Sequence, residues 1–327
     1  MTLPLFDSYA IDIPRSEPIA TLDELAARAR DYADHSQADS TRRAYASDLR
    51  DFYRFCSTID AAALPATPQT VALYVTELAA AVKVSTIRRR LSAVSVLHRR
   101  ASLDSPCSHR VVRDVLQGIS REKGTATRRV SAITVGVLRS LLLAVEGDDV
   151  AAKRDRAILL IGFAVALRRS EIAALRVEDL RFTKQGMLVR IVRSKTDQTG
   201  EGIDLAVPHS PIASLCAVAA VRAYIEAAGI TSGQLFRTLS KYRKLSELPL
   251  DGRDVANLIQ RLVRRAGIEG DFSGHSLRSG FVTSAAEARV SLDNIMRTTR
   301  HRSLAVLQGY IRRADAFDSP ALSAIIG

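Results

Sequence analysis

The sequence has no tryptophan and only three cysteines among its 327 residues. Cys56, Cys107 and Cys216 are odd in number, lie far apart and form no Cys-x-x-Cys pair. This spacing argues against a disulfide framework and against a cysteine-based zinc site, and it predicts reduced thiols in a cytoplasmic protein. We expect no metal site and no cofactor.

A membrane-spanning stretch and a secretory signal are also missing. The longest apolar run, residues 157–167, is shorter than the roughly 20 residues that cross a bilayer. It indicates a buried helix, and no membrane partner is expected. The first 20 residues contain acidic side chains and lack the apolar core of a signal peptide.

The net charge of +12 is unevenly distributed along the chain. Residues 1–35 carry three Arg and seven Asp or Glu, a net of −4, so the other 292 residues carry +16. A basic excess favours a polyanionic partner such as nucleic acid, bound by the body of the protein and not by its first segment. A genome bias towards Ala and Arg explains the excess equally well, so the charge alone leaves both interpretations open.

Helical periodicity and loop composition predict two domains. Residues 1–20 form a flexible leader, 21–122 a helical domain, 123–130 a linker, 131–317 a second domain and 318–327 a detached tail. Thr67 and Pro68 mark the start of one helix in the first domain. The basic stretch 121–129 suits a linker along a phosphate backbone, although an ordinary solvated loop fits it as well.

The second domain combines helices with a small β-hairpin. Residues 187–193 alternate and are rich in Val and Ile, and a polar turn over 194–202 leads to a second strand at 203–207. Helices are expected around this hairpin, including 212–227, 252–266 and 277–288. The fold class predicted is mainly α with a small β-hairpin or sheet: a helical N-terminal domain followed by an α+β domain.

Three clusters in the second domain suggest chemistry. Arg168 directly follows the apolar run, where a guanidinium needs a carboxylate or a phosphate to contact. Glu171 lies three residues later, on the same helix face, so a plain structural ion pair also explains the cluster.

The other two clusters are His275 with Arg278, and His301 with Tyr310. The first pair lies at a predicted helix N-terminus, which favours binding of an anion. Taken alone, it is also typical of capping or surface residues. Tyr310 follows His301 by nine residues, and a lone tyrosine in a late helix more often packs than reacts.

Taken together and in this order, the clusters resemble the tyrosine recombinase (phage integrase) family. That family has an Arg in an LRxSE-like segment, a hairpin Lys, an HxxR pair, and a His or Trp nine residues before a nucleophilic Tyr. In this sequence the positions are filled by Arg168, Lys195, His275 with Arg278, His301 and Tyr310. The resemblance covers about residues 36–313 and includes the helical core-binding domain of the two-domain Cre-like or Xer-like members.

Two positions depart from the family pattern. Ala166 stands where many members have Gly before the Leu-Arg pair, and Arg300 stands where many have Gly before the His. Neither replaces a catalytic group, but Arg300 makes the fit of the final loop and the direction of His301 open questions.

The resemblance implies that Tyr310 attacks a DNA phosphodiester and forms a 3′-phosphotyrosyl link, without metal or ATP. Arg168 and Arg278 would bind the charged oxygens of the phosphate. His275 would accept the tyrosine proton or hold the phosphate, and Lys195 would protonate the leaving 5′-oxygen.

Further roles follow from the same resemblance. His301 would donate another hydrogen bond to the phosphate, and Glu171 would orient Arg168 or His275. The expected partner is double-stranded DNA with paired half-sites, on which four copies assemble; an accessory protein is left open. Basic residues expected to contact DNA are Arg42, Arg43, Arg88, Arg89, Arg90, Arg99, Arg100, Lys123, Arg128 and Arg129.

Two other activities fit the same residues. A type IB topoisomerase has a closely related catalytic set but relaxes supercoils as a monomer. A non-catalytic DNA-binding accessory protein would keep the fold without the reaction, although intact residues at all six positions argue against it. The detached tail, as a subunit-docking helix, favours recombination.

Overall fold

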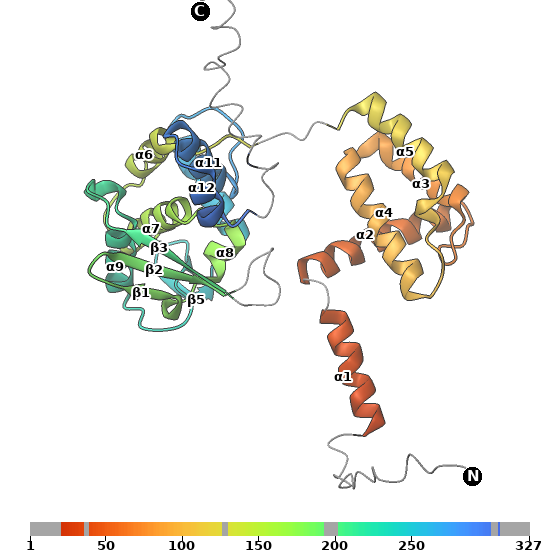
Figure 1. Ribbon diagram of the computed structural model, residues 1–327, viewed down its shortest axis with the longest axis horizontal. Coiled ribbons are helices and arrows are strands. Elements are labelled where there is room, and N and C mark those ends of the chain that lie inside the picture. The colour runs from red at the N-terminus through yellow and green to blue at the C-terminus, as the bar shows by residue number, and fades with distance from the viewer. Residues whose placement is uncertain (1–20, 36–38, 126–129, 193–201, 302–306, 308–327) are drawn as a thin grey trace, which may run out of the picture. The chain divides into compact units, whose positions relative to one another are not determined.

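The computed structural model describes residues 21–35, 39–125, 130–192, 202–301 and 307. The chain divides into two compact units, Met1–Thr127 and Arg128–Gly327 (Figure 1). Four candidate site residues, Lys195, Tyr310, Arg128 and Arg129, lie outside the described residues, as do the expected leader and tail.

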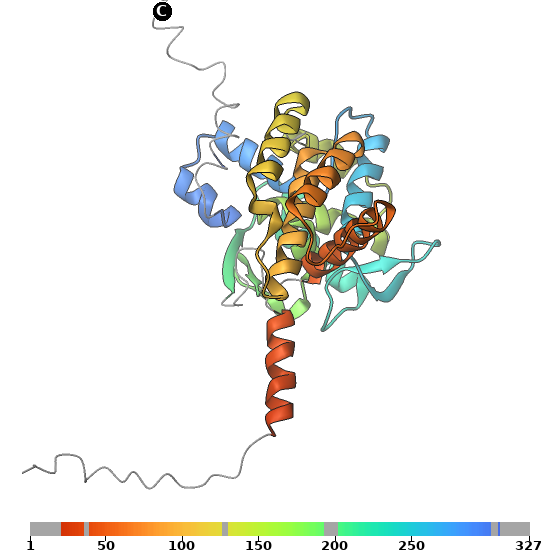
Figure 2. The same ribbon diagram turned by 90° about the vertical axis from the view of Figure 1, so that its right-hand side faces the viewer.

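The described part of the first unit is helical. α2 packs on α4, and α3 packs on α5 (Figure 2). The core between these helices includes Phe52, Tyr74 and Ile87. Thr67 caps α3 as predicted, because its Oγ accepts the Thr70 N–H at 3.1 Å. The elements are α1 Leu22–His35, α2 Asp39–Thr58, α3 Pro68–Ala81, α4 Val84–Arg100, the 3₁₀ turn η1 Pro106–Ser108, and α5 Arg110–Lys123.

Helices surround two small antiparallel sheets in the second unit, which confirms the predicted fold class. Its helices are α6 Val135–Leu143, α7 Val150–Ala164, α8 Arg169–Ala174, α9 Ala217–Ala228, α10 Gly252–Arg265, α11 Ser276–Glu287 and α12 Leu292–Thr299, with 3₁₀ turns η2 Val177–Asp179 and η3 Ala213–Leu215. Its strands are β1 Leu180–Phe182, β2 Gly186–Ile191, β3 Ile203–Pro208, β4 Arg237–Leu239 and β5 Leu245–Pro249.

The predicted hairpin is the β2–β3 pair, in which Val189 lies opposite Leu205 with both side chains buried. β1 adds a third strand to it, and β4 and β5 form a second sheet. The sequence did not indicate the β4–β5 pair, because its residues lie partly exposed and show no alternation of buried and open positions.

α7 is the central helix of the second unit and is buried on most of its surface. Gly162 lets neighbouring helices approach it closely: a Cβ at this position would lie 2.8 Å from the side chains of Ile172 on α8 and Leu277 on α11. These are the helices that carry Glu171 and Arg278. Close packing on α7 therefore brings two of the predicted clusters together.

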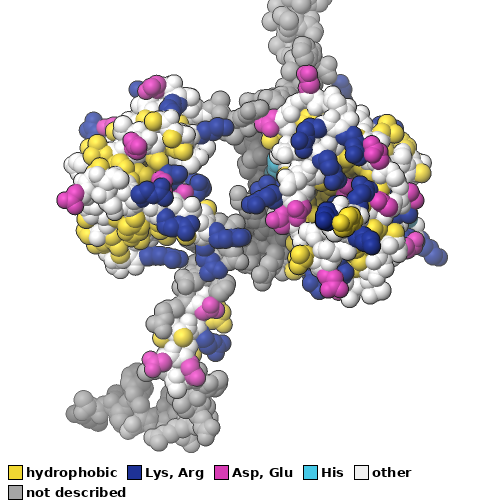
Figure 3. Space-filling view, turned by 180° about the vertical axis from the view of Figure 1, so that it is seen from behind, with side chains coloured by type: hydrophobic (Ala, Val, Ile, Leu, Met, Phe, Trp, Pro, Cys, Tyr) yellow, Lys and Arg dark blue, Asp and Glu magenta, His cyan; other side chains and the backbone are white. Residues whose placement is uncertain are grey.

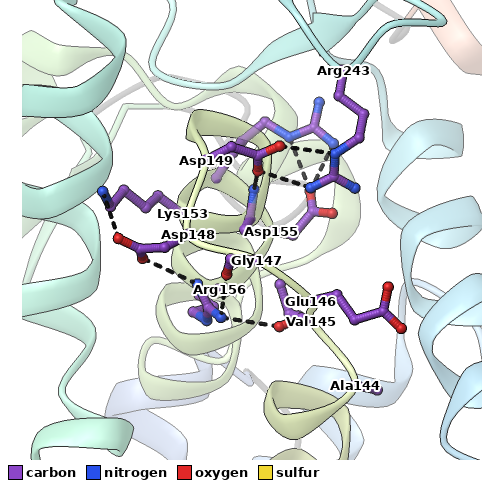
Figure 4. A network of polar contacts seen from close by, with 12 residues as sticks. Ala144, Val145, Glu146, Gly147, Asp148, Asp149, Lys153, Asp155, Arg156 and Arg243 are labelled. Carbon is purple, nitrogen blue, oxygen red and sulfur yellow. Dashed lines mark hydrogen bonds and ion pairs between the residues drawn. The ribbon is translucent and has the colours of Figure 1, made fainter.

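A polar network fixes the first turn of α7 (Figure 4). Asp149 caps the helix by accepting the Ala152 N–H at 2.8 Å, and it pairs with Arg243 through contacts of 2.8 and 3.0 Å. These bonds lower the pKa of Asp149 to about 2, chiefly through the Arg243 hydrogen bond. Because Arg243 lies between β4 and β5, the pair attaches that hairpin to the start of α7.

Along the described ranges, every helix is too short or too polar to pass through a lipid bilayer.

Candidate active site

Arg168 lies at the start of a new helix and not on the apolar helix before it. α7 ends in a Schellman arrangement: the Ala166 N–H donates to Phe163 O and the Leu167 N–H to Gly162 O, each at 3.0 Å. Ala166 adopts φ 48°, the left-handed conformation that this ending requires. The chain turns there, and Arg168 becomes the N-cap of α8.

Glu171 is the acceptor that organises this end of α8. Its Oε1 accepts Nη1 of Arg168 at 2.6 Å, and its Oε2 accepts the backbone N–H of Arg168 at 2.9 Å. Oε2 also accepts Nη2 of Arg300 at 2.7 Å. The carboxylate is buried, so these charge-assisted bonds offset the loss of its hydration.

Arg278, on α11, is the most completely buried arginine of the site, with 1% of its surface exposed. Its Nη1 donates to Ala166 O at 2.7 Å, and its Nη2 contacts Thr299 O and, at 3.3 Å, Nε2 of His301. The guanidinium is thereby held between the end of α7 and the end of α12.

The hydrogen bonds around His301 define its tautomer. The Thr299 hydroxyl donates its single proton to Ile295 O at 2.6 Å, so Nδ1 of His301, 2.8 Å from that hydroxyl, must be the donor there. Nε2 is then unprotonated and accepts from Arg278, so neither ring nitrogen has an N–H left for the phosphate bond that the resemblance implied. Burial, followed by the charges of Arg278 and Arg168, lowers the pKa of His301 to about 4, in agreement with a neutral ring.

His275 lies at the N-terminus of α11. Desolvation, followed by the charges of Arg278 and then Arg168, lowers its pKa below the usual value, although the residue keeps an exposed edge. The same two arginines act on His275 and His301. The structure therefore gathers Arg168, Glu171, His275, Arg278 and His301 at one place in the second unit.

Arg300 is the site residue whose contacts sequence reasoning missed. Its side chain is 7% exposed and reaches both Glu171 and, at 3.4 Å, the carbonyl of Ala166. Its backbone has φ 57° at the end of α12, just as Ala166 is left-handed at the end of α7. The one available signal was that each residue replaces a glycine of the family pattern.

Arg89, Arg90 and Lys123, three of the candidate DNA-contact residues, have partners on other helices of the first unit. Arg89 pairs with Asp48, and Arg90 pairs with Asp51 and contacts the Tyr74 hydroxyl at 3.3 Å. The Lys123 ammonium bonds the carbonyl of Ala79. These contacts give each of the three a structural role.

The remaining described candidates lie on α2 and α4. Arg43, Arg88, Arg99 and Arg100 are exposed, and Arg42 is half-buried. Figure 3 shows Lys and Arg mixed with Asp and Glu on the visible faces of the two units. Whether these residues contact DNA stays a prediction.

Lys195 and Tyr310, the two catalytic candidates outside the described residues, each have described residues near them in the sequence. β2 ends at Ile191 and β3 begins at Ile203, so Lys195 belongs to the segment that joins them. Leu307 is fully buried in a cluster with Val282 and Ile295, from α11 and α12. Within the described ranges, no three His, Cys, Asp or Glu side chains are grouped so that they could hold a metal ion.

Comparison with known proteins places both units. Residues 131–316 match the phage integrase family, and residues 32–103 match the N-terminal SAM-like domain of phage integrases. An integrase/recombinase XerD homolog of Selenomonas ruminantium is 36% identical over 305 residues, covering 92% of this chain and 89% of that protein. The recombinase Cre of Escherichia phage P1 is 28% identical over 331 residues, covering 93% and 94%.

A solved structure shares the fold. The lambda integrase dimer bound to a COC′ core site has a TM-score of 0.60 at 18% identity, covering 88% of this chain and 94% of that one. The same integrase, solved as a tetramer bound to a Holliday junction, has a TM-score of 0.59 at 17% identity, covering 90% and 78%.

The site is therefore a cluster of arginine and histidine side chains on the fold shared with these integrases. The chain belongs to the phage integrase family: it is a tyrosine site-specific recombinase, an enzyme that cuts and rejoins DNA.

Proposed function

We propose that the nucleophile of this recombinase is Tyr310, which attacks a DNA phosphodiester to form a 3′-phosphotyrosyl link and a free 5′-hydroxyl. The observation that carries the proposal is the convergence of Arg168, Arg278 and His301 around the ends of α7 and α12. Leu307 packs against residues of α11 and α12, the helices whose ends carry Arg278 and His301. Tyr310 follows it by three residues, which bounds its Cα to within about 11 Å of that of Leu307.

The two arginines that we assign to the phosphate are Arg168 and Arg278. A pentacoordinate phosphorus carries extra negative charge on its nonbridging oxygens, and guanidinium groups stabilise that charge through paired hydrogen bonds. Arg168 keeps 19% of its side chain exposed while Glu171 holds one nitrogen. Its remaining N–H groups are the ones we assign to the phosphate.

Proton transfer is assigned to histidine and lysine. A tyrosine hydroxyl has a pKa near 10, so Tyr310 must lose its proton as it attacks. Because the pKa of His275 is lowered, its ring is neutral at pH 7 and able to accept that proton. Lys195 is the proposed acid that protonates the leaving 5′-oxygen.

The proposed reaction needs neither ATP nor a divalent metal. The phosphotyrosyl ester keeps the energy of the broken phosphodiester, and the arginines supply the positive charge that a metal provides elsewhere. Full activity in EDTA is the expected result.

The proposed assembly is a tetramer on two DNA sites, each a pair of half-sites. Lambda integrase, which shares the fold, forms a dimer on a core site and a tetramer on a Holliday junction. In our proposal, residues 21–122 and 131–317 close on the duplex, residues 123–130 link them, and residues 318–327 dock on a neighbouring copy. The three free cysteines support a place in the cytoplasm, in a cell of bacterial, phage or plasmid type.

A nicked suicide duplex tests the proposal. The duplex carries the half-sites that the wild-type protein recovers from random-sequence DNA, and adducts are resolved on a denaturing gel. Wild-type protein should form a covalent adduct, and Tyr310→Phe should form none while binding the duplex normally. Tight binding of the duplex by the wild-type protein without an adduct would identify an accessory protein. Relaxation of a supercoiled plasmid that lacks the half-sites would identify a topoisomerase.

A further inference from the structure

Arg300 joins the two halves of the active site. Through Nη2 it bonds Glu171, the partner of Arg168, and it also reaches the Ala166 carbonyl that Arg278 shares. A continuous set of contacts thus runs from Arg168 through Glu171, Arg300 and Ala166 to Arg278.

The bond to Glu171 limits how that carboxylate meets Arg168. Oε2 of Glu171 is occupied by the Arg168 N–H and by Arg300, which leaves Oε1 for the guanidinium of Arg168. Arg168 is therefore held through a single nitrogen. A carboxylate with both oxygens available would favour the bidentate fork and take two guanidinium nitrogens of Arg168.

The conformation of Arg300 is unfavourable in two respects. Its backbone is left-handed, a region that disfavours side chains with a Cβ. Its Nε and Nη1 are buried and have no hydrogen-bond partner within the described part of the chain. Such costs persist where the surrounding contacts impose them, and they gather at functional sites.

We propose that Arg300 is a positioning residue that occupies one oxygen of Glu171 and so keeps the Arg168 guanidinium available for the DNA phosphate. Arg300 acts through Glu171 and does not itself touch the reacting atoms. The proposal rests on the role that we assign to Arg168 in strand cleavage.

The test compares the full-length variants Arg300→Gln, Arg300→Lys and Arg297→Gln. Arg297 is exposed on α12, so Arg297→Gln matches the charge lost in Arg300→Gln without altering the site. Circular dichroism and urea denaturation verify that each variant is folded. Cleavage is measured as a single turnover on the nicked duplex, and binding is measured on the same DNA.

We expect Arg300→Gln to slow cleavage on the order of 10²-fold, the usual effect of a displaced catalytic group. The DNA affinity of Arg300→Gln should stay within about twofold of that of Arg297→Gln, because one phosphate contact contributes little to the binding free energy of the whole protein–DNA complex. The double variant Glu171→Gln/Arg300→Gln should cleave no more slowly than Glu171→Gln alone, since both changes act through one carboxylate. Additive losses, or equal rates for Arg300→Gln and Arg297→Gln, would overturn the proposal.

A second measurement uses no DNA and so remains decisive if the wild-type protein forms no adduct. Inorganic phosphate is titrated into each protein while the imidazole resonances are followed by NMR. Arg300→Gln should bind phosphate about tenfold more weakly than wild type, with Arg297→Gln unchanged. Arg300→Lys should keep the pKa of His301 low, because burial, its main cause, and the positive charge at position 300 both remain, yet it should weaken phosphate binding. Wild-type phosphate affinity in Arg300→Gln would contradict the proposal.

Discussion

The carbonyl oxygen of Ala166 accepts a hydrogen bond from Nη1 of Arg278 at 2.7 Å, across 112 residues of sequence. Ala166 is left-handed at the end of α7, and this backbone turn aims its carbonyl at α11. A helix ending thus fixes the position of a buried guanidinium.

Replacement of Arg278 by lysine should abolish most of the cleavage activity. A lysine keeps the charge but lacks the fork that reaches Ala166 O and Thr299 O together. We expect the single-turnover rate to fall about 10²- to 10³-fold, as when one transition-state donor is lost. Urea denaturation should also show a loss of about 1–3 kcal/mol, because a buried carbonyl is left without its donor. A near-normal rate would remove Arg278 from the phosphate site.

The neutral state of His301 predicts a pH dependence of stability. Its pKa is about 4 in the folded protein and near 6.5 unfolded, so the unfolded state binds the proton more readily. The free energy of unfolding should therefore fall as the pH drops from 6.5 to about 4. The free energy of unfolding of His301→Gln should fall less than that of the wild-type protein over this pH range. Urea denaturation at half-unit pH steps measures the difference, and parallel curves for the two proteins would refute it.

Alanine substitutions at Arg90 and Arg88 should distinguish a residue that stabilises the fold from one that binds DNA. Arg90 pairs with Asp51, with its side chain 18% exposed, whereas Arg88 is exposed on α4. Arg90→Ala should lower the stability of the first unit by about 1–3 kcal/mol, because the partly buried Asp51 loses its closer cationic partner. Arg88→Ala should leave stability unchanged and reduce the salt dependence of DNA binding. Thermal melts and binding at two salt concentrations distinguish them; stability losses of equal size would contradict the assignment.

Because Arg300 has a left-handed φ, we expect glycine and alanine at this position to differ in their effect on stability. Both substitutions remove the side chain and its bond to Glu171, but only alanine keeps a Cβ in the unfavourable conformation. Arg300→Gly should therefore be more stable than Arg300→Ala by about 1 kcal/mol. Urea denaturation of the two variants gives this difference directly. Equal stabilities would mean that the α12 ending rearranges when the arginine is lost.

Sequence patterns were informative where side chains repeat on one face or where a cap residue is explicit. Thr67 before Pro68 located α3, and the alternation around Val189 located the β2–β3 hairpin. The helix endings at Ala166 and Arg300 were not visible, because no glycine or proline marks either one. The sequence placed Arg168 directly after the apolar run and on one helix face with Glu171, but it did not show the left-handed turn that separates α7 from α8.

The sequence also could not show which residues pair with each other when they lie far apart along the chain. The three arginines at positions 88–90 read as one basic surface, but α4 packs on α2 and meets Asp48 and Asp51 there. Periodicity tells which face of a helix is buried and not which carboxylate it meets. The sequence did not predict α12, because this helix is short and few of its residues are buried, which leaves a weak periodic pattern.

The most direct test of the central claim is the identity of the residue that becomes linked to DNA. The covalent adduct on the nicked duplex is digested with trypsin and nuclease, and the modified peptide is sequenced by mass spectrometry. We predict the peptide of residues 303–312, modified on Tyr310 through a 3′-phosphate. An adduct on any other residue, or a link to a 5′-phosphate, would contradict the account.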